Sequence, residues 1–120
     1  NAMMAHLLDS LDAGKDIGHY GRLVFAMVAR HFMTDDELVS WLTKSPDFPD
    51  DHARSLVAQV RGHDYSPPRP EKIMEWQAQQ NFPISPSDDP DACNVYKDLK
   101  FPDGIYQPIE EYYEHKTQAP

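Results

Sequence analysis

The sequence predicts an all-α protein, a compact bundle of about four principal helices with a Pro-rich, aromatic-containing C-terminal arm. Apolar residues recur at helical spacing through the first half, and helix start and stop signals separate these stretches. The alternation of apolar and polar residues that is typical of a half-buried strand does not occur. We expect one small domain over residues 4–120, with the bundle core at about 16–80 and the arm and last helix at about 81–116. Residues 1–3 are interpreted as a tag remnant and start methionine.

Two helices are predicted before residue 34. A short helix over residues 5–11 ends at Gly14, and a longer one over residues 17–33 follows the capping residue Asp16. The apolar residues of the longer helix cover a wide arc, which predicts a position at the centre of the bundle. One stripe of this helix is expected to face solvent or a partner, namely His19, Arg22, Ala26, Ala29 and Arg30.

Two further helices are predicted between residues 34 and 62. Thr34 followed three residues later by Glu37 is a capping box, in which each side chain satisfies a backbone N–H at the start of a helix over residues 35–43. The next helix places four apolar residues at i, i+3, i+4 and i+7, which predicts a one-sided buried stripe. Gly62 ends this helix, and the stripe is Ala53, Leu56, Val57 and Val60.

The second half is broken by prolines, which exclude a long helix or a central strand. Ser66 is the predicted N-cap of a helix that runs to about Gln80 and pairs Ile73 with Trp76. Residues 82–90 are expected to be loop, and residues 91–99 one or two helical turns. A last helix over residues 108–116 begins with proline and has two glutamates in its first turn, where the helix dipole favours them.

The net charge of −9 reflects 20 acidic against 11 basic residues. Such an acidic surface repels phosphate backbones, so a general nucleic-acid-binding role is disfavoured. A single cysteine excludes an internal disulfide framework. The longest apolar run, residues 23–29, is too short to span a bilayer. We therefore expect a cytoplasmic protein with no membrane partner.

Metal and catalytic patterns are weak. The six histidines and Cys93 show no pair at the close spacing of structural metal sites, so no metal and no cofactor are predicted. Cys93 lies among acidic residues, which raise a thiol pKa rather than activate the thiol. Asp88, Asp89 and Asp91 fit solvated turn and capping positions better than an acid–base pair. An enzyme is not predicted, although a site assembled in an oligomer stays a third, weaker possibility.

Basic residues recur on two predicted helices. His19, Arg22 and Arg30 share one stripe, and Arg54 and Arg61 lie at i and i+7 on another helix. We call these five residues the predicted arginine patch; if the two faces converged, it could contact a phosphate, a nucleic acid or an acidic partner segment. The competing interpretation, which the sequence favours, is that the arginines pair with nearby acids, namely Asp16, Asp50, Asp51 and Asp64.

The order of elements adds a resemblance. An arginine-bearing apolar helix followed by Asp35-Asp36-Glu37-Leu38-Val39 resembles the small helical domains that follow some primase-polymerases. The resemblance covers about residues 16–61 and contains no diagnostic motif. It does not assign the chain to that family.

Aromatic residues in the Pro-rich arm are the candidate partner-binding residues, because tyrosine and phenylalanine bury large areas in interfaces as well as in cores. They are Phe82, Phe101, Tyr106, Tyr112 and Tyr113. Residues 67–70 also form a P-x-x-P pattern, which fits either an aromatic-lined groove of a partner or the start of a helix.

The function predicted from these observations is a non-enzymatic protein-interaction module or accessory protein that binds another protein or itself. The alternative is a nucleic-acid or nucleotide-binding accessory domain that uses the predicted arginine patch.

Overall fold

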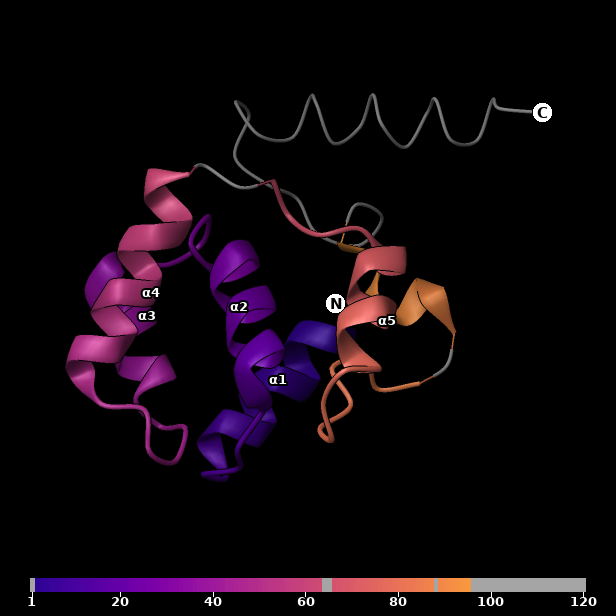
Figure 1. The fold of residues 1–120 in the computed structure, drawn as a ribbon, viewed down its shortest axis with the longest axis horizontal. Helices are drawn as coiled ribbons and strands as arrows, with labels where there is room; N and C mark the ends of the chain where they lie inside the picture. Colours follow the sequence, from indigo (N-terminus) through magenta and orange to yellow (C-terminus); the bar gives the residue numbers. More distant parts are fainter. Residues whose placement is uncertain (1, 64–65, 88, 96–120) are drawn as a thin grey trace.

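The fold is all-α, as predicted. The structure, a computed structural model, describes residues 2–63, 66–87 and 89–95, and within these residues it contains five α-helices, one 3₁₀ helix and no strand. Figure 1 shows them in order: α1 (Ala2–Asp12), α2 (Gly18–Ala29), α3 (Asp35–Leu42), α4 (Asp50–Gly62), α5 (Pro70–Gln77) and η1 (Pro90–Cys93). The helix predicted over residues 108–116 lies outside the described residues.

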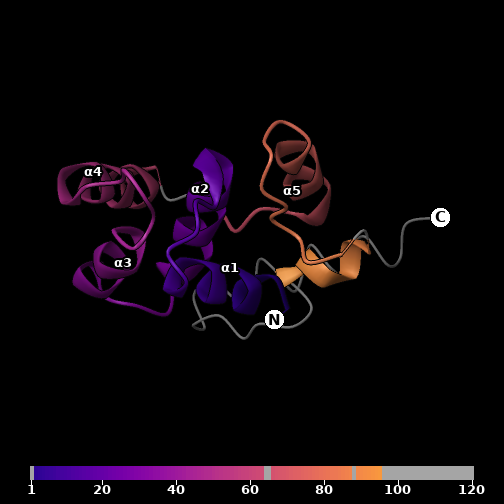
Figure 2. The same cartoon turned by 90° about the horizontal axis from the view of Figure 1, so that it is seen from below.

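Helix α2 lies at the centre of the fold. Figures 1 and 2 place it between the α3–α4 pair and α5, and it contacts each of the other four α-helices. Val24, Phe25 and Val28 are completely buried. The wide apolar arc read from the sequence therefore has its expected cause, which is packing on several sides.

The stripe of α2 that was expected to face solvent is buried in its C-terminal half, so this prediction was wrong there. Ala26 is fully buried, Ala29 is 2% exposed and Arg30 is 9% exposed. Only the first turns agree with the prediction, since His19 is exposed and Arg22 is half-buried. The physical reason is that neighbouring helices surround the C-terminal turns of α2 and leave no solvent-facing side there.

The core extends beyond residues 16–80 in both directions. Met3, Leu7 and Leu11 of α1 are fully buried, so a residue that was set aside as outside the fold contributes to the core. At the other end, Ile84, Cys93 and Val95 are fully buried too, and η1 contacts both α1 and α5. The segment from 84 to 95 therefore closes the core over α1 and α5.

The helix starts predicted from the sequence agree only partly with those in the structure. The capping box is confirmed, because the Glu37 N–H donates to Thr34 Oγ1 at 3.2 Å and the Thr34 N–H donates to Glu37 Oε1 at 3.1 Å. The predicted cap of α2 was wrong by one residue, because the N-cap is Ile17 and it makes no side-chain capping bond, although Asp16 Oδ1 accepts from the Gly18 N–H at 2.9 Å. Helix α5 begins later than predicted, with Arg69 rather than Ser66 at the N-cap and Pro70 in the first turn.

The side chain of Gln80 is one of those that join the two halves of the chain. Its Oε1 accepts from the Tyr20 N–H at 3.0 Å, and its Nε2 donates to the Ile17 carbonyl at 2.9 Å and to the Phe82 carbonyl at 3.1 Å. The Tyr20 N–H is one of the first-turn donors of α2 that have no partner within the helix. Gln80 thus caps α2 from the far side of the chain.

Gly18 makes room for this contact. Its φ is +79°, and a Cβ built on it would lie 2.5 Å from Gln80 Oε1. A side chain at position 18 would therefore be strained in the left-handed region and would displace the Gln80 amide from its partners.

We predict that Thr34→Ala lowers the free energy of unfolding by about 1 kcal/mol, because it removes the side-chain acceptor of the capping box. Ser66→Ala is the matched control and should change it by less than about 0.5 kcal/mol, since Ser66 is exposed and precedes the N-cap of α5. Urea denaturation monitored by circular dichroism measures both values. Equal losses in the two variants would contradict the assignment of the caps.

We predict that Gln80→Ala lowers the free energy of unfolding by about 1–3 kcal/mol, because partly buried backbone groups of residues 17 and 20 lose their partner. The neighbouring Gln79→Ala should cost less than about 0.5 kcal/mol, since Gln79 makes only an exposed bond to the Tyr20 hydroxyl among the described contacts.

Gly18→Ala combined with Gln80→Ala gives a double-mutant cycle. The loss in the double variant should be smaller than the sum of the single losses, because both single variants disrupt the same Gln80 hydrogen bonds and the collision disappears when position 80 is alanine. Additive losses would show that Gly18 and Gln80 are not coupled.

Candidate interaction surfaces

Arg22 of the predicted arginine patch is held inside the fold. Its Nη1 donates to Asp16 Oδ1 at 3.1 Å and to Ser45 Oγ at 3.3 Å. Its guanidinium carbon lies 4.5 Å from the centroid of the Phe48 ring, and its side chain is 16% exposed. Arg22 therefore ties the first turns of α2 to the connection between α3 and α4.

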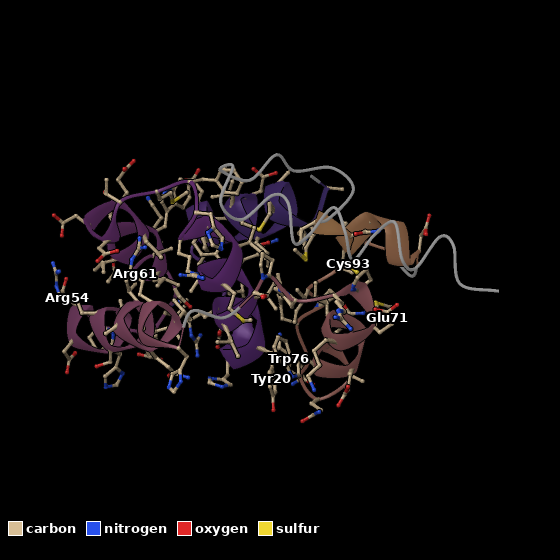
Figure 3. All side chains as sticks on the ribbon, turned by 90° about the horizontal axis from the view of Figure 1, so that it is seen from above. Tyr20, Arg54, Arg61, Glu71, Trp76 and Cys93 are labelled. Atoms are coloured by element: carbon tan, nitrogen blue, oxygen red, sulfur yellow. The ribbon has the colours of Figure 1, made fainter. Side chains whose placement is uncertain are left out.

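Arg54 and Arg61 lie on α4 toward the first turn of α3, where Figure 3 labels them. Arg54 Nε donates to Asp50 Oδ2 at 2.7 Å, and Arg54 Nη1 lies 3.5 Å from Asp36 Oδ1. The bond to Asp50 and its negative charge raise the pKa of Arg54 above its usual value. These contacts join the starts of two helices.

Arg61 closes the C-terminal end of α2. It forms an ion pair with Asp35, and its Nη2 donates to the Arg30 carbonyl at 3.3 Å and to the Met33 carbonyl at 3.4 Å. These carbonyls follow the last turn of α2, where a positive charge is favoured by the helix dipole. Arg61 therefore binds backbone groups at the C-terminal end of α2, and Gln80 binds backbone groups at its N-terminal end.

The structure brings only part of the predicted patch together: Arg61 contacts the backbone of Arg30, and Arg54 and Arg61 pair with the neighbouring residues Asp36 and Asp35. Arg22, Arg54 and Arg61 each have a carboxylate of the same chain as a partner, Arg30 is buried, and His19 is exposed beside Tyr20. Asp16 and Asp50 are the partners that the sequence suggested. Asp35 and Asp36 were not among the partners that the sequence suggested, because pairing across the interface between α3 and α4 leaves no local signal.

Phe82 is the one predicted partner-binding aromatic residue within the described part of the chain. Its ring stacks on His6 of α1, with centroids 5.2 Å apart and planes 11° apart. His6 Nε2 also donates to the Pro83 carbonyl at 2.8 Å. These contacts attach the start of the Pro-rich arm to α1. The other four candidates, Phe101, Tyr106, Tyr112 and Tyr113, lie outside the described residues.

The P-x-x-P pattern belongs to the fold. Pro67, Pro68 and Pro70 are all buried, and Pro70 occupies the first turn of α5. Buried prolines are not offered to the groove of a partner, so the interpretation as a helix start holds.

Cys93 is a buried residue of the core. Burial raises the pKa of its thiol, and the negative charges of Glu71 and Asp89 add to the increase. The expected direction is therefore correct, but the larger cause is removal of the thiolate from water rather than the neighbouring acids. The neutral thiol is the form that this environment favours.

An aromatic pair that the sequence analysis did not select lies where α2 meets α5 (Figure 3). The rings of Tyr20 and Trp76 stack with centroids 5.7 Å apart and planes 20° apart. His19 meets the Tyr20 ring edge-on at 5.2 Å, and Lys72 Nζ lies 5.6 Å from the centroid of Trp76. We call this surface, with Gln79 bonded to the Tyr20 hydroxyl, the Tyr20–Trp76 junction.

Trp76 was expected only as a core partner of Ile73. The structure buries Ile73 completely and leaves Trp76 half-buried, so one residue faces the core and the other faces the junction. The available sequence signal was Lys72 at i−4 from Trp76, a spacing that brings a cation over a ring on one helix face.

The described residues contain neither a helix suited to cross a membrane nor a cluster of metal-ligating side chains. None of the helices there has the length and apolarity needed to cross a membrane. Within the same residues, no three His, Cys, Asp or Glu side chains are grouped closely enough to hold a metal ion.

Comparisons with known proteins give one partial similarity and two negative results. No family model matches the chain, and no solved structure matches it. Over 75 residues the chain is 27% identical to the protein described as DNA primase large subunit PriL of Thermoplasma acidophilum. The aligned part makes up 58% of this chain and 22% of that protein, so the chain spans about a fifth of the length of the curated relative that it matches.

Proposed function

We propose that the protein is a non-enzymatic helical module that binds another protein, as an accessory part of a larger assembly. The observation that carries the proposal is the internal pairing of Arg22, Arg54 and Arg61 with carboxylates. Cations engaged in this way are poorly available to phosphates, and the net charge of −9 opposes phosphates further. Partly exposed aromatic rings, which favour protein interfaces, are present at the Tyr20–Trp76 junction.

The limits of the core define which part of the arm is available for a partner. Ile84, Cys93 and Val95 are fully buried, so removal of residues 82–120 would take away core side chains together with the arm. The partner-binding hypothesis is therefore best tested on the aromatic residues beyond position 95.

The partial similarity is compatible with an accessory role. The Thermoplasma protein is by its description one subunit of a primase, and this chain is similar to a part of it. A module related to part of a subunit is expected to work in contact with other proteins.

We predict that replacing Phe101, Tyr106, Tyr112 and Tyr113 together by serine weakens capture of the partner at least tenfold, because large aromatic side chains dominate binding energy at interfaces. The measurement is affinity capture from the native host with the full chain as bait, followed by titration of the captured protein. The control variant Gln107→Ser/Thr117→Ser/Gln118→Ser changes polar residues of the same segment and should bind normally.

Thermal unfolding of both variants shows whether the fold is preserved. Unchanged capture by the variant that lacks the four aromatic residues would contradict their predicted role. A full chain that captures no protein specifically would contradict the proposed function itself.

The second candidate function is a nucleic-acid-binding accessory domain, and the similarity to a primase subunit is the observation that favours it. If the protein has this second function, we expect a fluorescent 20-nucleotide single strand to bind at low salt and its affinity to fall steeply as salt is added. Arg22→Ala/Arg54→Ala should weaken binding more than Lys15→Ala/Lys116→Ala, which removes the same charge outside the predicted arginine patch. Absence of binding at low salt would remove this candidate.

A further inference from the structure

We propose that the Tyr20–Trp76 junction is the docking surface for an arginine- or lysine-rich segment of the partner, an inference that rests on the proposed protein-binding function. The junction offers two stacked rings on an acidic protein, and both rings are half-buried rather than covered. Three properties of the structure support a basic occupant: the use of ring faces by cations elsewhere in the fold, the rigidity of the pair, and the balance of charge around it.

Aromatic rings of this protein repeatedly hold cations. Arg22 lies over Phe48 at 4.5 Å, Lys44 lies over Trp41 at 5.3 Å, and Lys72 lies over Trp76 at 5.6 Å. Each contact places a positive charge against the negative face of a ring. At the junction the intramolecular cation is Lys72, whose side chain is 50% exposed and can therefore be exchanged for a cation of a partner.

The ring pair is held in place before any partner arrives. The Tyr20 hydroxyl donates to Gln79 Oε1 at 3.1 Å, and the Tyr20 N–H donates to Gln80 Oε1 at 3.0 Å. Gln77, which follows Trp76 on α5, accepts from the Ser85 N–H at 2.7 Å and ties α5 to the segment after it. A pre-organised pair loses little conformational entropy on binding.

Charge at the junction favours a basic segment over a nucleic acid. Glu75 precedes Trp76, is 60% exposed and lies 3.6 Å from Lys72 Nζ, so it can accept a guanidinium that replaces Lys72. A single strand could stack its bases on the same rings, but its phosphates would meet the Glu75 carboxylate on a protein of net charge −9.

Replacement of Lys72 distinguishes a role at the binding surface from a purely structural role. Lys72→Gln removes the competing cation and releases Glu75, so it should tighten binding of an arginine–serine peptide about five- to tenfold. Lys15→Gln makes the same change of net charge away from the junction and should alter affinity less than about twofold. Tyr20→Leu should weaken binding about fivefold or more, and Tyr20→Phe, which keeps the ring but loses the bond to Gln79, should weaken it less.

The experiment uses the full chain with Trp41→Phe, which leaves Trp76 as the single tryptophan and makes its fluorescence specific to the junction. The probes are a 12-residue alternating arginine–serine peptide, the corresponding glutamate–serine peptide and a 12-nucleotide single strand of thymidines. The expected result is a salt-dependent fluorescence change with the basic peptide alone. Calorimetry with the chain that retains Trp41 confirms the affinities, and circular dichroism confirms the fold of each variant.

Several results would overturn the proposal. They are the absence of a Trp76 signal with the basic peptide, equal effects of Lys72→Gln and Lys15→Gln, and tighter binding of the single strand than of the peptide. Even if Tyr20→Leu fails to fold, the two lysine variants still decide the matter. Failure here with continued capture through the aromatic residues beyond position 95 would leave the proposed function intact, so the two hypotheses fail separately.

Discussion

The contact between Gln80 and the first turn of α2 is the interaction on which the arrangement of the two halves depends. A single amide satisfies the Tyr20 N–H, the Ile17 carbonyl and the Phe82 carbonyl, and it therefore fixes the start of α2, the residues after α5 and the start of the Pro-rich arm together. Because Trp76 lies one turn before Gln80, the same contact sets its ring against that of Tyr20. The candidate interaction surface is thus a consequence of how the halves are joined.

Electrostatic pairing inside the fold determines what the surface can recognise. Arg61 neutralises Asp35 and closes the end of α2, and Arg22 binds Asp16 and lies over Phe48, so both cations serve the connections between helices. Each such ion pair contributes little to stability at an exposed site, but it engages the arginine with a carboxylate of the same chain. Because the net charge is −9, we propose a basic partner in preference to a phosphate backbone.

Features that depend on residues close together in the sequence could be predicted. Contacts between residues far apart in the sequence could not. The capping box of Thr34 and Glu37 depends on four consecutive residues, and the apolar stripe of α4 depends on eight, so both are visible in a short window. By contrast, Arg61 meets the carbonyl of Arg30 across 31 positions and Gln80 meets Tyr20 across 60, and neither pairing alters the local pattern. The Tyr20–Trp76 junction was missed for the same reason, since each ring alone reads as an ordinary core residue.

The burial of Val95 changes how the Pro-rich arm should be understood. Phe82 stacks on His6, and Ile84, Cys93 and Val95 fill the space between α1 and α5, so this stretch belongs to the core rather than to an appendage. A segment whose apolar side chains are already buried has little left to offer a partner. On the proposed function, the candidates for partner binding are therefore the aromatic residues that follow Val95 and the Tyr20–Trp76 junction. Because Glu75 and Lys72 already form an ion pair beside Trp76, the junction is the part whose ligand can be argued from chemistry: a cation that takes the place of Lys72 keeps both the ring contact and the charge contact.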